Sequence, residues 1–515
     1  MQAINTEQQV FLRVRINLCV HLEHIKRDQV LVKISILHIS DLHRDHENPI
    51  TNEGLLVSLI QDLESAATED PPIPTPQIVI VSGDIVQGAS LDTPNPDELI
   101  SQQYDQATQF LARLADQLLG GDRKKIVIVP GNHDIDFPKM RQSLEEIDYA
   151  SVSKDQRALL ANEYWKANSE YRWSWSEFKL YKIVDQHLYN SRFDHFRSFY
   201  NNFYGSASYP LEPEGQFDIF DFPEYNLTIA GLNSCFQNDP WHRSGAIHSQ
   251  ALSNCCDQMR DRQFQGRLRL AAWHHSTKGS PNEDDYLDAD FLQQLINYNY
   301  SLGFHGHQHK PEQIQSKFAF GGDKKVNVFS ASTLAGGHTA LASGDSRGYN
   351  IVVLDTDEWK GELHVRTMVN NDFANPIWGV GTLSSPDRSE KFDIQKPPSV
   401  NQRLTLTSDL SEAEILLRAG NSTEAAQILE PLSRRDDMAK RLLLTAFDAS
   451  SNYEGIVRCF SEPQSSEEII KYLLALEELG ETDMLTEVLN RPEVSQDVDP
   501  AVVIIRDKLQ AKIDA

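Results

Sequence analysis

The sequence predicts an α/β fold that carries a helical insert and is followed by an all-α region. Between residues 30 and 372, short runs rich in β-branched residues alternate with helical or loop stretches. Several runs are apolar on both faces, which is typical of a buried sheet covered by helices. Residues 407–515 contain no convincing strand. The predicted strands span residues 32–40, 77–83, 125–131, 226–232, 267–273, 301–306, 326–332, 350–356 and 363–369.

The length of 515 residues predicts several domains, because single domains typically have about 100–200 residues. The character of the sequence changes after "PPSV" (397–400), which marks a boundary. The predicted parts are an N-terminal extension (1–29), an α/β domain (30–395) with an insert (137–224), a linker (396–406) and a helical repeat-like domain (407–515).

The composition is typical of a globular protein, with 40% hydrophobic and 24% charged residues. There is no run of about 18 apolar residues, and charged residues interrupt the first thirty positions, where a signal peptide would be apolar. Five cysteines without a C-x-x-C pair argue against a disulfide framework and a zinc ribbon. We therefore expect a cytoplasmic protein with no membrane partner. The net charge of −27 argues against a generic nucleic-acid coat, although a local basic groove or metal site would still bind phosphate.

The insert is rich in aromatic residues, and helical spacing fits much of it. One interpretation is a small helical cap with its own aromatic core. The other is a lid that faces the substrate, in which basic residues lie near stacking rings as in grooves for single-stranded nucleic acid. The basic residues in question are Arg172, Lys179, Lys182, Arg192 and Arg197.

The C-terminal region contains a weak internal repeat. Similar segments occur at 419–429, 449–460 and 479–489, a spacing of 30 residues. They resemble short, degenerate tetratricopeptide-type repeats, and a plain helical bundle is the alternative. Stacked helix pairs commonly present an extended binding surface, so we expect this region to bind a protein partner.

Polar side chains follow five of the predicted strands at the point where each strand ends. They are Asp41 and His43, then Asp84, then Asn132 and His133, then His274 and His275, and last His307 and His309. Binding sites in open α/β sheets form at the carboxyl ends of strands, so we expect these side chains to meet at one edge. Mixed oxygen and imidazole ligands suit first-row divalent metals. Two such ions about 3.5–4 Å apart need one bridging carboxylate, and a single central aspartate fits that task.

Taken in order, these blocks read D-x-H, G-D, G-N-H-D, H and G-H-x-H. The set resembles the calcineurin-like metallophosphoesterase superfamily, over residues 33 to about 370. The resemblance implies a two-sheet sandwich flanked by helices. It also implies two divalent metal ions, for which Mn, Fe and Zn all suit the ligands.

The resemblance assigns a role to each motif residue. His133 would bind no metal and would stabilise the phosphoryl transition state or protonate the leaving oxygen. Asp41, His43 and His309 would hold one ion, Asn132, His274 and His307 the other, and Asp84 would bridge them.

Two neighbouring histidines stay outside this ligand set. His275 stands where the family often has a second histidine before a proline, which Ser276 replaces here. His305 shares the strand parity of the two ligands that follow it. We predict a packed strand histidine there, with a supporting contact to a ligand as the alternative.

The sequence also bears on the substrate. "GDIVQGAS" lacks the arginine that the superfamily's Ser/Thr protein phosphatases carry soon after the bridging aspartate, and "PGNHD" differs from their R-G-N-H-E. The resemblance therefore favours the phosphodiesterase and nuclease branches. We expect hydrolysis of a phosphodiester of nucleic-acid or nucleotide type, by attack of a hydroxide that bridges the two ions. The alternatives are a phosphomonoesterase or protein phosphatase, and a non-catalytic, metal-stabilised scaffold.

Overall fold

The computed structural model describes residues 33–513, except 167–168, 206–207, 280–284, 289, 318–323, 337–340, 342–344, 371, 382–387, 398–409, 411–412, 415, 418–419 and 434–435. The predicted extension at 1–29 and residues 398–406 of the predicted linker lie outside the described residues. The chain divides into two compact units between Pro397 and Pro398.

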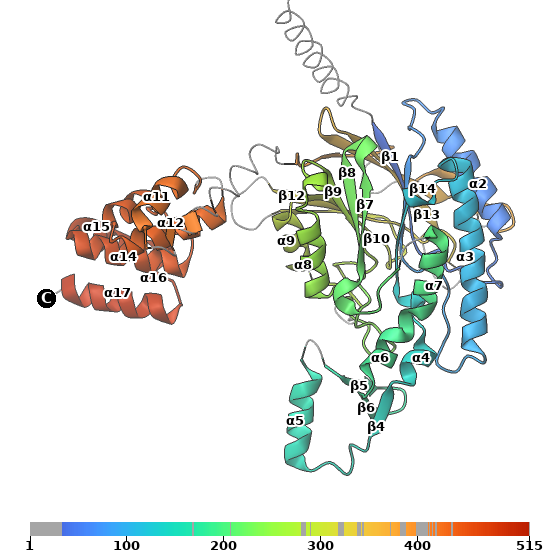
Figure 1. Ribbon diagram of the computed structural model, residues 1–515, viewed down its shortest axis with the longest axis horizontal. Helices are drawn as coiled ribbons and strands as arrows, with labels where there is room; N and C mark the ends of the chain where they lie inside the picture. The colour runs from blue at the N-terminus through green and yellow to red at the C-terminus, as the bar shows by residue number, and fades with distance from the viewer. Residues whose placement is uncertain are drawn as a thin grey trace, which may run out of the picture. The chain divides into compact units, whose positions relative to one another are not determined.

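The first sheet of the N-terminal unit has the strand order β15-β14-β13-β1-β2-β3, and β16 pairs with β14 (Figure 1). β1, β2 and β3 are parallel, so their carboxyl ends lie at the same edge. Every residue of these three strands is buried, as expected for a sheet covered on both faces. The strands are β1 (Ile34–Ile39), β2 (Ile78–Ser82), β3 (Ile126–Val129), β13 (Gly348–Asp355), β14 (Lys360–Met368), β15 (Trp378–Val380) and β16 (Glu390–Asp393).

The second sheet has the order β11-β12-β10-β9-β8-β7. Its four central strands are parallel, and β7 and β11 pair antiparallel at the edges. β2 contacts β10 and β3 contacts β8, so the two sheets lie against each other and the predicted two-sheet sandwich is confirmed. The strands are β7 (Phe217–Phe222), β8 (Leu227–Leu232), β9 (Leu268–Ala272), β10 (Tyr300–His305), β11 (Glu312–Lys317) and β12 (Lys325–Ser330).

Helices flank both sheets (Figure 1). On the first sheet, Asp62 of α2 forms a buried ion pair with Arg366 of β14, with an Oδ1–Nη2 distance of 2.6 Å. On the second sheet, α8 contacts β7 and β8, and α9 contacts β10, β11 and β12. The helices are α2 (Asn52–Ala66), α3 (Pro96–Leu118), α8 (Ser249–Gln258) and α9 (Asp290–Asn297).

The insert at 137–224 contains strands as well as helices, so the prediction of a helical insert was only partly right. A three-stranded antiparallel sheet, β4-β6-β5, lies within the insert. The last strand of the insert, β7, belongs to the second sheet and pairs with β8. Aromatic residues fit a pleated, half-buried surface as well as a helix, and burial alternates along β5, where Arg172 and Ser174 are buried. The elements are α4 (Phe137–Arg141), β4 (Leu144–Ile147), α5 (Lys154–Tyr164), β5 (Tyr171–Ser174), β6 (Lys179–Ile183), α6 (Gln186–Asn190) and α7 (Asp194–Tyr204).

The described part of the C-terminal unit is helical, as predicted. α11, α13 and α15 begin at residues 422, 453 and 482, so their spacings are 453 − 422 = 31 and 482 − 453 = 29 residues. From α11 to α15 each helix contacts the next, and α17 contacts α14 and α15. The helices are α11 (Ser422–Leu429), α12 (Asp437–Ala449), α13 (Tyr453–Cys459), α14 (Ser466–Leu479), α15 (Thr482–Leu489), α16 (Pro492–Ser495) and α17 (Pro500–Ile513).

Within the described residues, none of the helices combines the length and the apolar character needed to cross a membrane.

Candidate metal centre

The seven predicted ligands lie just beyond the carboxyl ends of five strands. They are Asp41 and His43 after β1, Asp84 after β2, Asn132 after β3, His274 after β9, and His307 and His309 after β10. Five of them have positive φ angles: Asp41 (53°), His43 (42°), Asp84 (50°), His307 (72°) and His309 (56°). Such backbone costs about 1–3 kcal/mol at a non-glycine residue and gathers at functional sites. The strain therefore marks this edge of the sandwich.

Two glycines let the loops of this edge approach one another. A Cβ at Gly306 would collide with Ser40 Oγ and Asp41 Oδ2. A Cβ at Gly131 would collide with the backbone nitrogen and Oδ1 of Asp84. Both positions require glycine because the side chain of a neighbouring loop already fills the space.

A first group of side chains surrounds Asp41. One ligand atom each from Asp41, His43, Asp84 and His309 lies within 4.8 Å of all the others. His309 Nε2 is 3.1 Å from Asp41 Oδ1 and 3.3 Å from His43 Nε2. Asp41 Oδ1 is buried and accepts no hydrogen bond. Imidazole nitrogens facing each other and an unbonded carboxylate oxygen form an arrangement that a divalent cation would stabilise.

A second group surrounds Asn132. Its Oδ1 atom is 3.0 Å from His274 Nε2 and 3.0 Å from His307 Nδ1. His274 Nδ1 lies 2.8 Å from the carbonyl oxygen of Ser82 and donates a hydrogen bond to it, because a carbonyl only accepts. This second contact orients the imidazole so that Nε2 faces Asn132, as is usual for metal-binding histidines.

Asp84 lies between the two groups. Its Oδ2 atom is 3.8 Å from His43 Nε2 in the first group and 3.3 Å from His274 Nε2 in the second. Its Oδ1 atom accepts a hydrogen bond of 2.8 Å from the backbone nitrogen of His133, which fixes the carboxylate. One carboxylate thus reaches both groups, as a bridging ligand must.

The ligands shift one another's pKa values. Burial, the largest influence, favours the neutral form of Asp84, but His274, His133 and His43 outweigh it and hold the pKa of Asp84 well below its usual range. Burial also lowers the pKa of His274, but Asp84 outweighs it and raises that pKa to about 9. For His43, burial and the nearby His133 lower the pKa to about 3. The residues present, two carboxylates, one amide and four imidazoles, fit a pair of first-row divalent ions.

A comparison with family models identifies the N-terminal unit. The model described as calcineurin-like phosphoesterase matches residues 34–311, which is more than half of the chain and includes all seven ligands. The chain belongs to the calcineurin-like phosphoesterase family. Its fold supports a hydrolase that acts on phosphoric esters, with a candidate metal-binding site at the edge described above.

Solved structures give more distant likenesses to this phosphoesterase. A dimetal phosphatase from Danio rerio is 12% identical, with a TM-score of 0.35, and the match covers 67% of this chain and 98% of that one. Vacuolar protein sorting 29 from Cryptosporidium parvum is 11% identical, with a TM-score of 0.27, over 70% of this chain and 98% of that one. No curated protein matches the chain.

His133 lies beside the first group of the phosphoesterase site. Its ring centroid is 4.7 Å from that of His43, in an edge contact. Its Nδ1 atom donates a hydrogen bond of 2.7 Å to the carbonyl oxygen of Gln87. That bond fixes the orientation of the ring.

Asp134, the last residue of the G-N-H-D block, ties two ligand loops together and was missed by the sequence analysis. Its buried carboxylate accepts hydrogen bonds from the backbone nitrogens of Gly131 (2.8 Å) and Ile85 (3.2 Å) and from the Tyr104 hydroxyl (3.0 Å). It thereby holds the loop that carries Asp84 against the loop that carries His133. The block contained the residue, but only the fold shows what it binds.

Asp285 was also missed, because no motif contains it. Its Oδ2 atom lies 3.5 Å from His307 Nε2, on the side of the ring opposite the Asn132 contact. A carboxylate behind a ligand histidine raises the basicity of that ligand.

The two histidines outside the ligand set are buried. His275 Nδ1 is 3.0 Å from Ser234 Oγ, and Asn238 Nδ2 lies 3.2 Å from His275 Nε2, so both ring nitrogens already have partners. His305 lies in β10 with its ring stacked on Trp273 at a centroid distance of 5.9 Å. The structure therefore places His305 as a packed strand histidine.

A hollow of about 550 Å³ opens beside His133. Apolar side chains form most of its wall, including Leu91, Ile135, Phe137 and Pro240. Asp92 also lines it, and no lysine or arginine is among the described residues that do. We call it the His133 hollow.

Proposed function

We propose that the chain hydrolyses a phosphodiester at a centre that holds two divalent metal ions. The observation that supports this most strongly is the position of Asp84, whose Oδ2 atom reaches a histidine in each ligand group. In the proposal, Asp84 is the shared ligand. The separate ligands are Asp41, His43 and His309 for one ion, and Asn132, His274 and His307 for the other.

The metal ions would neutralise the phosphate oxygens and provide a water nucleophile near neutral pH. The chain's own residues hold the geometry. Ser82 and Asp285 contact the far nitrogens of His274 and His307 and fix those rings. His133, held by Gln87, would stabilise the charge that develops on the phosphoryl group or give a proton to the leaving oxygen.

The His133 hollow favours a diester over a monoester. A phosphomonoester carries about two negative charges near neutral pH, and enzymes commonly bind that charge with an arginine clamp. Here the hollow offers the carboxylate of Asp92 and an apolar wall. An uncharged second ester group would fit this wall, whereas a dianion would be repelled by Asp92.

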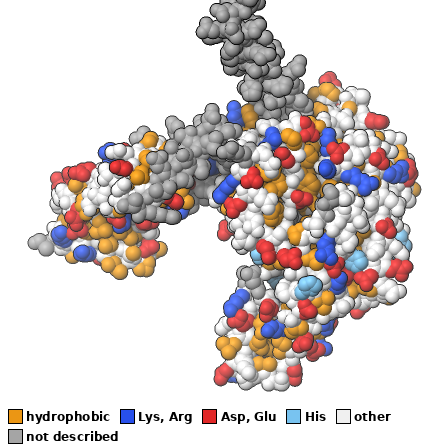
Figure 2. Space-filling model, in the orientation of Figure 1, with side chains coloured by type: hydrophobic (Ala, Val, Ile, Leu, Met, Phe, Trp, Pro, Cys, Tyr) orange, Lys and Arg blue, Asp and Glu red, His pale blue; other side chains and the backbone are white. Residues whose placement is uncertain are grey.

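The insert favours a small diester over a nucleic-acid strand. Arg172 forms a buried ion pair with Asp239 at 2.5 Å, and Lys179 pairs with Glu146 at 2.8 Å. The other three basic residues considered for a nucleic-acid lid are also engaged: Lys182 with Glu170, Arg197 with Asp194, and Arg192 with the carbonyl oxygens of Tyr189 and Phe236. Basic and acidic side chains intermingle over the insert in Figure 2, which is unlike the continuous positive track of strand-binding proteins.

The test is a comparison of substrates on the metal-loaded full chain. We expect a higher kcat/KM for bis(4-nitrophenyl) phosphate than for 4-nitrophenyl phosphate, and lower activity on single-stranded DNA, RNA and a phosphopeptide. Asp92→Lys should reduce the ratio of diester to monoester kcat/KM, because a lysine in the hollow would attract the doubly charged monoester. Asp45→Lys is the control and should leave this ratio unchanged, because Asp45 does not line the hollow and pairs with exposed His46. A monoester preference would indicate a phosphatase, and metal-loaded protein inactive on every ester would indicate a scaffold.

We also propose that the C-terminal helices recruit a partner and take no part in catalysis. All the proposed ligands lie between residues 41 and 309, in the other compact unit. A chain that ends at Pro397 should stay folded, keep its metal and hydrolyse the small diester at nearly the full-length rate. A soluble, metal-loaded but inactive truncation would show that the C-terminal unit shapes the active site.

A further inference from the structure

A second group of potential ligands lies outside the seven-residue centre. It comprises Asp97 in the first turn of α3, Asp136 just before α4, and His195 in the first turn of α7. One ligand atom from each lies within 4.8 Å of the other two. Three elements that are separate in the chain therefore meet at this point.

The distances match those of a tetrahedral cation. His195 Nε2 is 3.0 Å from Asp97 Oδ1 and 3.5 Å from Asp136 Oδ2. Zinc bonds to histidine nitrogen and carboxylate oxygen are about 2.0–2.2 Å long, so neighbouring ligand atoms of a tetrahedron lie about 3.3 Å apart. Both measured distances lie close to that value.

Asp136 supplies an independent indication. The residue is 2% exposed, and its Oδ2 atom is buried and makes no hydrogen bond. Its other oxygen accepts a hydrogen bond of 2.9 Å from the backbone nitrogen of Lys139, so the carboxylate is held in place. A buried carboxylate oxygen without a hydrogen bond, aimed at an imidazole nitrogen, is costly unless a cation binds it.

Two basic side chains of the neighbouring helices, Lys139 of α4 and Arg197 of α7, are engaged with another acid. Lys139 Nζ lies 2.5 Å from Asp194 Oδ2, and Arg197 Nη2 lies 2.7 Å from Asp194 Oδ1. Asp97 and Asp136 pair with His195 and with neither of these two basic side chains, so a cation that the three residues share would not have to displace a lysine or an arginine.

We propose that Asp97, Asp136 and His195 form a third divalent-cation site, of the kind that takes Zn²⁺ with two carboxylates and one imidazole. Water would complete the coordination, since the Asp97 side chain is 82% exposed. A cation there joins α3 and α7 to the loop that carries His133, three residues before Asp136. Its role is to hold that loop, and it is separate from the proposed hydrolysis.

The experiment counts zinc on the full-length chain. Purified protein is stripped with a chelator, equilibrated with Zn²⁺ alone and desalted, and its zinc content is measured by mass spectrometry. We expect three equivalents in the wild type and two in Asp97→Asn and His195→Gln. Glu98→Gln is the matched control, because Glu98 is the next exposed acid of α3, and it should keep three.

A second readout is the melting temperature with and without Zn²⁺. Part of the increase that zinc produces in the wild type should be lost in both variants and kept in Glu98→Gln. Asp97→Asn changes an exposed side chain, so the test remains valid even if His195→Gln fails to fold. Equal zinc content in wild type, Asp97→Asn and Glu98→Gln would overturn the proposal, whatever the activity at the dinuclear centre.

Discussion

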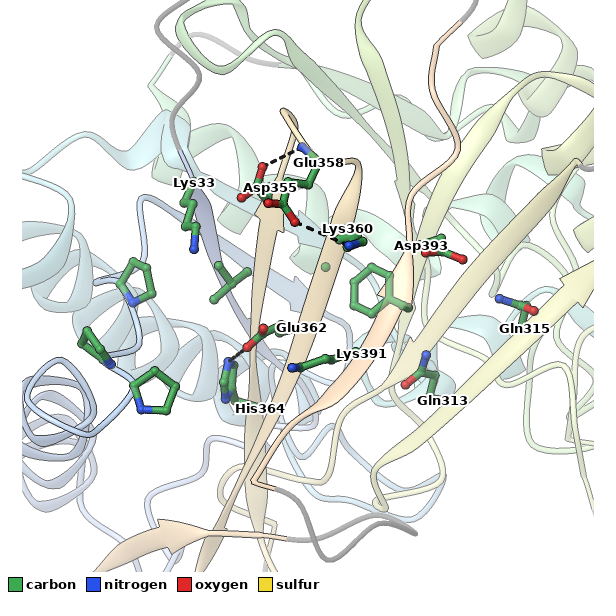
Figure 3. Close-up of a pocket in the computed structure, with 16 residues that line it drawn as sticks. Lys33, Gln313, Gln315, Asp355, Glu358, Lys360, Glu362, His364, Lys391 and Asp393 are labelled. Atoms are coloured by element: carbon green, nitrogen blue, oxygen red, sulfur yellow. Dashed lines mark hydrogen bonds and ion pairs between the residues drawn. The ribbon is translucent and has the colours of Figure 1, made fainter.

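Two hollows lie at opposite ends of β1. The His133 hollow, of about 550 Å³, is lined by residues that follow β2 and β3. The other, of about 780 Å³, is lined by Lys33 before β1 and by residues at the end of β13 and the start of β14 (Figure 3). We call it the Lys33 hollow. The larger of the two is therefore the one at the amino end of β1.

The two hollows differ in how their charges are satisfied. In the Lys33 hollow, Lys360 lies 3.5 Å from Glu358, and His364 lies 3.5 Å from Glu362. Lys360 and Glu358 are both exposed, so their pair contributes little energy, whereas His364 is buried beside a partly exposed Glu362. Beside the His133 hollow, imidazole nitrogens and carboxylate oxygens face one another in a buried space, as at Asp41 and His309. Buried carboxylate and imidazole atoms that face one another at the carboxyl ends of strands therefore indicate the candidate site better than the volume of a hollow does.

Asp84→Ala should have the largest effect and reduce diester hydrolysis to background. Asp84 is the side chain that reaches both ligand groups, so its loss should also lower metal content more than the loss of any other single ligand. Turnover and metal analysis of the same sample check this. Asp84→Asn keeps an acceptor for the His133 backbone and should be inactive too; wild-type turnover in either variant would contradict the account.

His133→Ala should have the next largest effect, a fall in kcat of about 10²–10⁴-fold with both proposed metal ions retained. His133 touches the proposed ligand His43 only through an edge contact between the two rings. In the proposal it acts on the substrate and holds no metal ion, so its loss should leave both ions bound. Steady-state kinetics and metal analysis separate the two roles. Metal loss in this variant would mean that His133 is a ligand.

His38→Gln should change how stability depends on pH. His38 lies buried in β1, between the two hollows, with Nε2 2.9 Å from Ser82 Oγ. Burial, with a smaller contribution from His305, lowers its pKa from 6.5 to about 3. The unfolded chain therefore takes up the proton first, and the free energy of unfolding falls as the pH drops from 6.5 towards 3. Near pH 4 this amounts to about 3 kcal/mol.

Urea unfolding between pH 4 and pH 8 measures this effect. The loss of stability on acidification should be smaller in His38→Gln than in the wild type. His46→Gln, which changes a histidine with a side chain 54% exposed, should keep the wild-type slope. If the free energy of unfolding changed with pH in the same way in all three proteins, His38 would not be held neutral in the folded state.

Glu362→Gln and Lys360→Gln, in the Lys33 hollow, should have the smallest effect. We expect kcat/KM for the diester to stay within about twofold of the wild type, since both residues line the Lys33 hollow and neither is a proposed ligand. The exposed pair of Lys360 with Glu358 is itself worth only about 0–1 kcal/mol. Diester kinetics on purified variants are the check. A tenfold loss would place the larger hollow in the reaction and reverse the comparison.

The sequence predicted nine of the thirteen described strands of the two sheets because these nine are short runs rich in β-branched residues. It missed β7, β11, β15 and β16, which are edge strands or short ones with few buried residues. It predicted the edge where Asp41, Asp84 and His307 meet because parallel strands present their carboxyl ends together. The β4-β6-β5 sheet was missed, since aromatic residues in short runs suit a strand and a helix equally. Asp285 and the group of Asp97, Asp136 and His195 were missed because their partners lie far away in the chain.

Anomalous diffraction from crystals of the full-length protein loaded with Mn²⁺ or Zn²⁺ would show whether two metal ions flank Asp84. We expect two peaks about 3.5–4 Å apart, one on each side of the Asp84 carboxylate. One peak would lie among Asp41, His43 and His309, and the other among Asn132, His274 and His307. A single peak, or no peak beside Asp84 in metal-loaded crystals, would contradict a dinuclear centre.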